Sequence, residues 1–139
     1  MLQQTQVKTC IPYFLKFIDR FPSLHDLAES DLETVLKMWE GLGYYARARN
    51  FHKAANIVYR QLNNDIPNDY YQFKRLPGVG DYIGAAVQSI AFGHPFAVVD
   101  GNVKRVLARL YCLHHPVNKP SNHRHFQAFV DRLLDIPCG

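Results

Sequence analysis

The stretch Leu-Pro-Gly-Val-Gly at residues 76–80 decides the fold, because it places a tight glycine turn between two segments with helical periodicity. A short helix is predicted to end near Arg75 and a longer one to begin near Tyr82. Glycines allow positive φ and close backbone approach, so amides of the turn and of the next helix start can converge on an anion such as a phosphate. The alternative is an ordinary helix–helix turn, which the spacing alone slightly favours. A dinucleotide-binding loop is disfavoured, since a helix and not a strand precedes the glycines.

On both sides of this turn, apolar residues recur at helical spacing and sustained strand alternation is absent. Helix boundaries are predicted from local signals. Ser30 with Glu33 indicates a capping box, Gly41 a helix end, and Asp81 and Asp100 helix N-caps. These signals predict about seven short helices packed as an all-α globule.

The composition narrows the class of protein. A chain of 139 residues with 47% hydrophobic content can build one compact core, which excludes a disordered protein. The formal charge of +4 favours a polyanionic partner, although weakly. Cys10, Cys112 and Cys138 are far apart and odd in number, so we expect no disulfide framework, no metal site and a reducing compartment. No apolar run approaches the roughly 20 residues that span a bilayer, so no membrane partner is expected.

A second informative stretch is Val-Val-Asp-Gly-Asn-Val-Lys-Arg at residues 98–105. Asp100 begins a predicted helix, and as a lone aspartate it is first a candidate cap. An accessible carboxylate at a helix start can also stabilise developing positive charge, and the two roles are compatible. The pattern of Lys104, Arg105 and Arg109 is most often that of a solvated basic face, and phosphate contact is the alternative.

A third stretch, residues 39–50, combines aromatic side chains, a glycine turn and two arginines. Such a combination can insert a ring into a base stack while cations hold the nucleic-acid backbone. The alternative, with equal weight, is that one tyrosine packs in the core and the arginines remain in solvent. Residues 3–6 supply amides that could bond to base edges, but a polar helix end explains them equally well.

Together with Met-Leu-Gln-Gln-Thr-Gln-Val at residues 1–7, these stretches resemble the MutY-type adenine DNA glycosylases of the helix-hairpin-helix superfamily, which also contains endonuclease III. The resemblance covers essentially the whole chain, and four motifs in the family's order make it specific. It implies the all-α six-helix barrel module of that fold. It also implies removal of adenine mispaired with 8-oxoguanine or guanine in double-stranded DNA, by a monomeric protein of the cytoplasm that is nucleoid-associated in a bacterium.

The resemblance implies catalytic roles for three residues. Asp100 would stabilise the oxocarbenium-like sugar during cleavage of the N-glycosidic bond, and Asn102 would support it. Tyr82 stands where the lyase branch has its Schiff-base lysine, and a phenol cannot form that imine. A monofunctional glycosylase is therefore implied, and a bifunctional lyase of the endonuclease III branch is disfavoured.

The resemblance also implies a set of DNA contacts. The glutamines near the start of the chain would probe the duplex beside the extruded adenine, a tyrosine would wedge beside the oxidised guanine, and the hairpin at residues 76–80 would bind a phosphate. The residues expected at the DNA are Gln3, Gln4, Thr5, Leu42, Gly43, Tyr44, Arg47, Gly78, Val79, Gly80 and Lys104.

Two family features lie outside this sequence. The family's catalytic glutamate would precede Met1, and its four cluster-ligating cysteines would follow Gly139. We therefore expect residues 1–139 to be a partial domain truncated at both ends, with no [4Fe–4S] cluster and with catalysis slowed by at least ~10²-fold for lack of a general acid. The alternative hypothesis is a non-catalytic helix-hairpin-helix module that only binds DNA.

Overall fold

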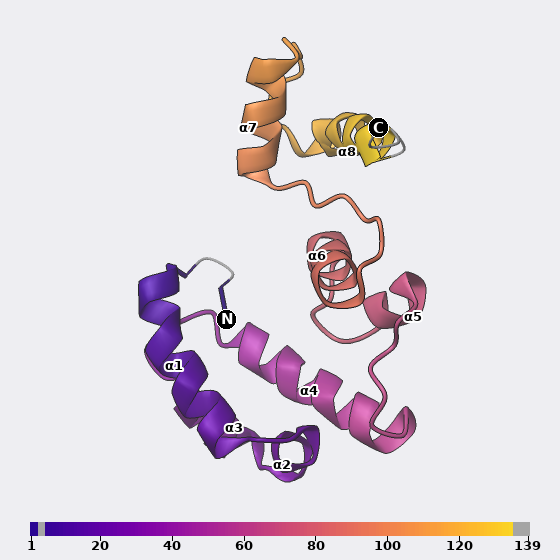
Figure 1. Ribbon diagram of the computed structural model, residues 1–139. Coiled ribbons are helices and arrows are strands. Elements are labelled where there is room, and N and C mark those ends of the chain that lie inside the picture. Colours follow the sequence, from indigo (N-terminus) through magenta and orange to yellow (C-terminus); the bar gives the residue numbers. More distant parts are fainter. Residues whose placement is uncertain (3–4, 135–139) are drawn as a thin grey trace. The chain divides into compact units, whose positions relative to one another are not determined.

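The computed structural model describes residues 1–2 and 5–134, which form two compact units. Unit 1 comprises Met1–Pro67 and Arg75–Gly78, and unit 2 comprises Asn68–Lys74 and Val79–Gly139. Every regular element of the described residues is a helix, which confirms the predicted all-α class (Figure 1). None of these helices has the length and apolar character needed to cross a membrane.

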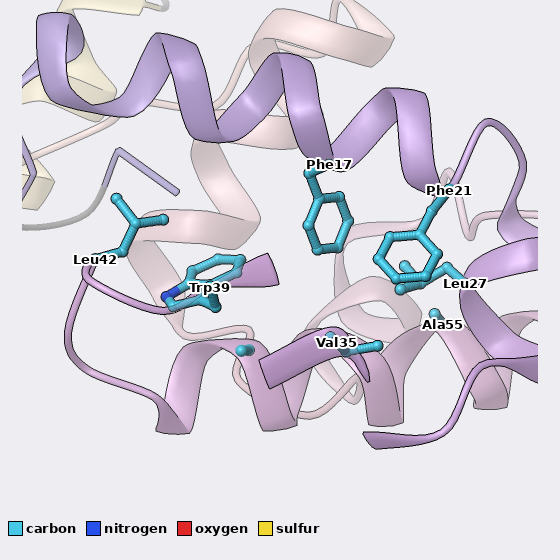
Figure 2. Packing of buried hydrophobic residues seen from close by; sticks show 8 residues of the cluster. Phe17, Phe21, Leu27, Val35, Trp39, Leu42 and Ala55 are labelled. Atoms are coloured by element: carbon cyan, nitrogen blue, oxygen red, sulfur yellow. The ribbon is translucent and has the colours of Figure 1, made fainter. Parts of the chain in front are cut away.

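Unit 1 is built around one apolar cluster. Its helices are α1 (Val7–Arg20), α2 (Leu24–Glu29), α3 (Leu32–Met38) and α4 (Ala46–Gln61). The Phe17 ring lies edge-on to the rings of Phe21 and Trp39, at centroid distances of 4.8 and 6.2 Å. The buried members of the cluster, drawn in Figure 2, are Phe17, Phe21, Leu27, Val35, Trp39, Leu42, Ala48 and Ala55. This core fixes the end of α3 and the start of α4, between which the turn with Leu42 lies.

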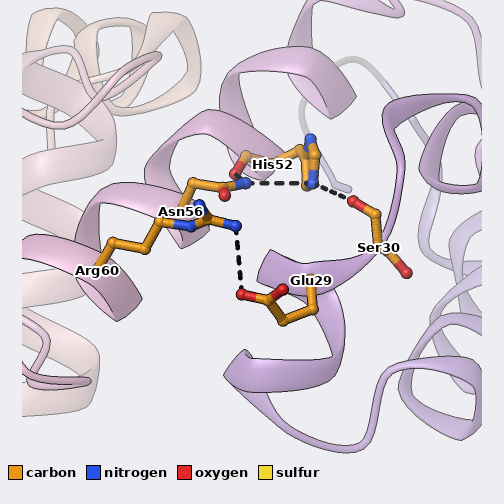
Figure 3. Close-up of polar contacts among 5 residues, drawn as sticks. All are labelled: Glu29, Ser30, His52, Asn56 and Arg60. Atoms are coloured by element: carbon orange, nitrogen blue, oxygen red, sulfur yellow. Dashed lines mark hydrogen bonds and ion pairs between the residues drawn. The ribbon is translucent and has the colours of Figure 1, made fainter.

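The helix starts in unit 1 differ in part from the prediction. Helix α3 begins after Asp31, whose carboxylate accepts a hydrogen bond of 2.7 Å from the Thr34 amide. The predicted Ser30–Glu33 capping box is therefore wrong. The physical reason is that Ser30 ends α2, and its carbonyl accepts a 2.9 Å hydrogen bond from His52 Nε2 on α4 (Figure 3).

A second contact between α2 and α4 lies beside this one. Arg60, in the last turn of α4, pairs with Glu29 at 3.2 Å (Figure 3). Both side chains are about half exposed, so the pair contributes at most ~1 kcal/mol. Packing of the apolar cluster therefore contributes more than this pair to holding α4 in place.

Unit 2 contains the remaining helices, which are α5 (Tyr70–Lys74), α6 (Asp81–Phe92), α7 (Gly101–Leu110), the 3-10 helix η1 (Pro120–Asn122) and α8 (His123–Leu134). Its buried cluster joins Val99, Leu107 and Phe126. Asp100 caps α7, as predicted. Asp81 is the first residue of α6 and Gly80 its N-cap, so the predicted Asp81 cap is wrong by one position.

Candidate functional site

The Asp100 carboxylate lies half-buried at the start of α7 and has two different partners. Its Oδ1 accepts a 2.7 Å hydrogen bond from the Val103 amide, and its Oδ2 accepts a 3.2 Å bond from Asn102 Nδ2. The first bond fixes the carboxylate on the helix axis. The second orients the other oxygen without neutralising its charge, so a capping role leaves the acid available for electrostatic work.

Asn102 is held in one amide orientation by its neighbours. A guanidinium can only donate, so Arg105 Nη2, at 2.5 Å, requires the amide oxygen of Asn102 on its side. The amide nitrogen must then face Asp100. The predicted support of Asp100 by Asn102 thus has a geometric basis. Arg105, which was not among the predicted site residues, sets the orientation of the Asn102 amide.

Lys104 follows in the same turn but faces the unit's own core. It is half-buried, and its Nζ lies 6.0 Å from the centroid of the Phe126 ring. An ammonium over an aromatic face is an attractive contact of about 0.5–1 kcal/mol. Its role at DNA stays a prediction.

The hairpin depends on Gly78. This residue has φ +80°, and a Cβ there would lie 2.7 Å from the Cβ of Asn50. Gly80 has extended backbone and no side chain, so it leaves the amides at the start of α6 without a side-chain cap. Val79 is half-buried, and Tyr82 is exposed in the first turn of α6. These features suit an anion at the helix start, where the amide dipoles converge.

An acidic side chain already lies at this helix start. Asp81 pairs with Lys74, and the Tyr70 hydroxyl lies 3.3 Å from the same carboxylate oxygen. The hydrogen bond from Lys74 is the main reason why the pKa of Asp81 is lowered, and the same bond raises the pKa of Lys74. This pair was not predicted, because two residues seven positions apart across a turn give no local signal in the sequence.

In unit 1, the turn between α3 and α4 presents Tyr44. Gly43 and Tyr44 both have positive φ, at +69° and +50°, and the Tyr44 side chain is 65% exposed. Leu42, by contrast, is buried in the core cluster. Within this turn Leu42 packs in the core and Tyr44 is exposed, and the insertion of the Tyr44 ring into DNA stays a prediction.

Arg47 faces the protein and not only solvent. Its Nη1 donates to the Met1 carbonyl at 2.9 Å, and its Nη2 lies 3.4 and 3.2 Å from the carbonyls of Leu42 and Gly43. Thr5 is half-buried, whereas the predicted contacts Gln3 and Gln4 lie outside the described residues. The structure therefore groups Leu42, Gly43, Tyr44 and Arg47 within unit 1, and Asp100, Asn102 and Lys104 within unit 2.

The two cysteines within the described residues lie in different surroundings. Cys10 is buried on α1, Cys112 is exposed, and Cys138 lies outside the described part. Residues 1–2 and 5–134 contain no group of three or more His, Cys, Asp or Glu side chains that could hold a metal ion. The expectation that residues 1–139 hold no [4Fe–4S] cluster stays a prediction.

Comparison with known proteins relates these features to a family. Residues 1–130 match the HhH-GPD superfamily base excision DNA repair proteins. An adenine DNA glycosylase of Buchnera aphidicola is 49% identical over 81% of this chain and 32% of its own length, and that of Homo sapiens is 47% identical over 79% and 20%. The chain thus spans about a third or less of these relatives.

The fold gives the same assignment. A trapped endonuclease III–DNA covalent intermediate superimposes with a TM-score of 0.81 and 25% identity over 98% of this chain and 62% of the other. A thermostable thymine-DNA glycosylase gives a TM-score of 0.78 and 27% identity over 92% and 58%. This chain belongs to the HhH-GPD superfamily of base excision DNA repair proteins.

Proposed function

We propose that this chain forms part of an adenine DNA glycosylase that removes adenine mispaired with 8-oxoguanine or guanine in double-stranded DNA. The observation that carries the proposal is the Asp100 carboxylate, oriented by Val103 and Asn102 at a helix start. The named relatives, all adenine DNA glycosylases at 47–49% identity, support the choice of base. A cytoplasmic, nucleoid-associated location belongs to the same proposal.

The chemistry proposed for Asp100 is electrostatic. When the N-glycosidic bond breaks, the electron pair leaves with adenine and positive charge develops on the sugar. An ionised carboxylate already held in place stabilises that charge without reorganising during the reaction. Water then adds to the sugar carbon and releases one proton, while the departing adenine takes up one proton, so the products are an abasic site and neutral adenine. The resemblance gives no other carboxylate of residues 1–139 a catalytic role, so we assign none as the acid that protonates adenine.

Recognition is proposed to come from the other predicted contacts. Turning an adenine out of the duplex costs a few kcal/mol of lost stacking and pairing. An inserted Tyr44 ring and phosphate contacts at Gly78, Gly80 and Lys104 would offset that cost. Tyr82, which is exposed on α6, cannot form an imine with an abasic sugar, so we propose a monofunctional enzyme.

The first test is single-turnover release of adenine from a duplex with adenine opposite 8-oxoguanine, with the 139-residue chain in excess. Asp100→Asn is the informative variant, because asparagine caps a helix as well as aspartate but carries no charge. We expect release to fall by at least ~10²-fold in the variant. Release at the wild-type rate by Asp100→Asn would contradict the proposed role.

A binding measurement covers the case in which the wild-type chain releases adenine too slowly to measure. The chain is titrated with duplexes that carry a cationic pyrrolidine or a neutral tetrahydrofuran in place of the target nucleotide. We expect the wild type to prefer the cation, and Asp100→Asn to lose about tenfold or more of that preference. Salt-sensitive binding with no preference in either protein would support the non-catalytic DNA-binding module instead.

A further inference from the structure

We propose that Arg47 is a positioning residue that holds the Tyr44 turn in its inserting conformation and does not itself bind a DNA phosphate. The inference rests on the proposed function, because it assigns Tyr44 as the inserted ring. It also replaces the expectation that Arg47 contacts DNA directly. The contacts that carry it all lie within unit 1.

The Arg47 guanidinium joins two distant segments of the chain. One nitrogen donates to the carbonyl of Met1, 46 residues away, and the other lies within 3.4 Å of the Leu42 and Gly43 carbonyls. A planar guanidinium with five N–H groups can serve both segments at once, whereas an ammonium cannot span them. Arg47 therefore ties the segment that leads into Gln3 and Gln4 to the Tyr44 turn.

The same guanidinium lies over two aromatic rings. Its central carbon is 5.5 Å from the Trp39 ring centroid and 5.4 Å from that of Tyr44. Trp39 is 2% exposed and also donates from Nε1 to the Gly43 carbonyl at 3.2 Å. Arg47 thus connects an exposed ring to a buried one that the core keeps fixed.

The Tyr44 turn needs such support because its backbone is strained. A tyrosine at φ +50° costs roughly 1 kcal/mol or more relative to its usual conformations. The 65% exposed ring has little packing of its own to offset this cost. The contacts of Arg47 with the Leu42 and Gly43 carbonyls and with the Tyr44 ring favour the observed turn, as does the Trp39 bond to the Gly43 carbonyl. Without them, the ring would sample other positions and lose part of the advantage of a pre-formed wedge.

The experiment compares Arg47→Gln with Arg49→Gln. Both remove one positive charge from α4, but Arg49 is exposed two residues further along the helix. Binding to a duplex with an adenine:8-oxoguanine mispair and to a fully matched duplex is measured over a series of salt concentrations. We expect Arg47→Gln to lose about as much of the preference for the mispair as Tyr44→Ala loses. The dependence of Arg47→Gln binding on salt concentration should have the same slope as that of the wild type. Arg49→Gln should keep the preference.

A double variant separates positioning from mere loss of structure. If Arg47 acts through Tyr44, the Arg47→Gln/Tyr44→Ala protein binds as Tyr44→Ala does, because the second change has nothing left to disturb. Additive losses would overturn the inference. So would a preserved preference together with a salt slope reduced by about 0.9 in Arg47→Gln, the signature of one lost phosphate contact. If Arg47→Gln does not fold, Arg47→Lys keeps the charge and should still lose the preference.

A measurement without DNA distinguishes failure of this inference from failure of the proposed function. Trp39 is the single tryptophan of the chain, so its fluorescence reports on the surroundings of this one ring, which include the Arg47 guanidinium. We expect acrylamide to quench Trp39 more strongly in Arg47→Gln than in the wild type or Arg49→Gln. Unchanged quenching would overturn the positioning role, whereas a wild type without mispair preference would count against the proposed function.

Discussion

Gly78 and Gly93 have nearly the same backbone conformation but different surroundings. Their φ angles are +80° and +72°, in the left-handed region that disfavours any side chain. A Cβ at Gly78 would meet the Cβ of Asn50 at 2.7 Å, while a Cβ at Gly93 would meet nothing within 4 Å. Gly78 is thus required both by its positive φ and by the nearby Asn50, whereas Gly93 is required by its positive φ alone.

This difference can be measured by substitution. Gly78→Ala and Gly93→Ala should both lose about 1 kcal/mol of unfolding free energy through backbone strain. Gly78→Ala should lose a further ~1–3 kcal/mol, because the Asn50 Cβ belongs to a helix and cannot move aside freely. Urea denaturation of the two variants and the wild type tests this. Equal losses would show that the contact with Asn50 is relieved without cost.

At the scale of elements, side-chain hydrogen bonds cap the starts of both α2 and α3. Ser23 and Asp26 form a capping box at the start of α2, and Asp31 caps α3. The pKa values of Asp26 and Asp31 are both lowered, for Asp26 chiefly by the Ser23 hydroxyl and for Asp31 chiefly by the Thr34 amide. Each helix start is therefore more stable with its aspartate ionised.

The lowered pKa of Asp31 predicts a pH dependence with a definite sign. The stabilisation is fully present above the usual pKa of 3.8 and is lost as the pH falls through the lower folded value. Asp31→Asn caps the helix but does not titrate. Below about pH 4, the Tm of the wild type should therefore fall more steeply with acid than that of the variant. Thermal unfolding by circular dichroism provides the measurement, and parallel curves would contradict the prediction.

For the whole molecule, we expect the affinity for DNA to depend on the position of a charge as well as on the net charge. The formal charge is +4, yet Asp81 places a negative group at the start of the hairpin's second helix, where a phosphate is proposed to bind. Its partner Lys74 partly compensates for it. The acid can compete with DNA for both Lys74 and the helix amides.

Two single substitutions separate local from global charge. Asp81→Asn and Asp19→Asn each raise the formal charge from +4 to +5, but Asp19 lies exposed on α1. We expect Asp81→Asn to strengthen duplex binding by about three- to tenfold at low salt, and Asp19→Asn by much less. Fluorescence anisotropy with one labelled duplex compares the two. Equal gains would mean that only the net charge steers DNA.

The sequence by itself determined the helical class, the cap at Asp100, the glycine hairpin and the family. The physical reason is that these features depend on neighbours in the chain. Helical periodicity spans three or four residues, a capping bond spans three, and a glycine turn needs positive φ at its own positions. Four such motifs in order left few families to consider.

Only the tertiary structure decided which groups from distant parts of the chain lie in contact. Arg47 donates to the carbonyl of Met1, 46 residues away, and the backbone carbonyl of Ser30 accepts a hydrogen bond from His52, 22 residues away. A Cβ at Gly78 would meet Asn50, which lies 28 positions earlier in the chain, counted from their residue numbers. A side chain bonds to whatever group the fold brings within about 3 Å, and that group is set by packing of the core and not by local sequence.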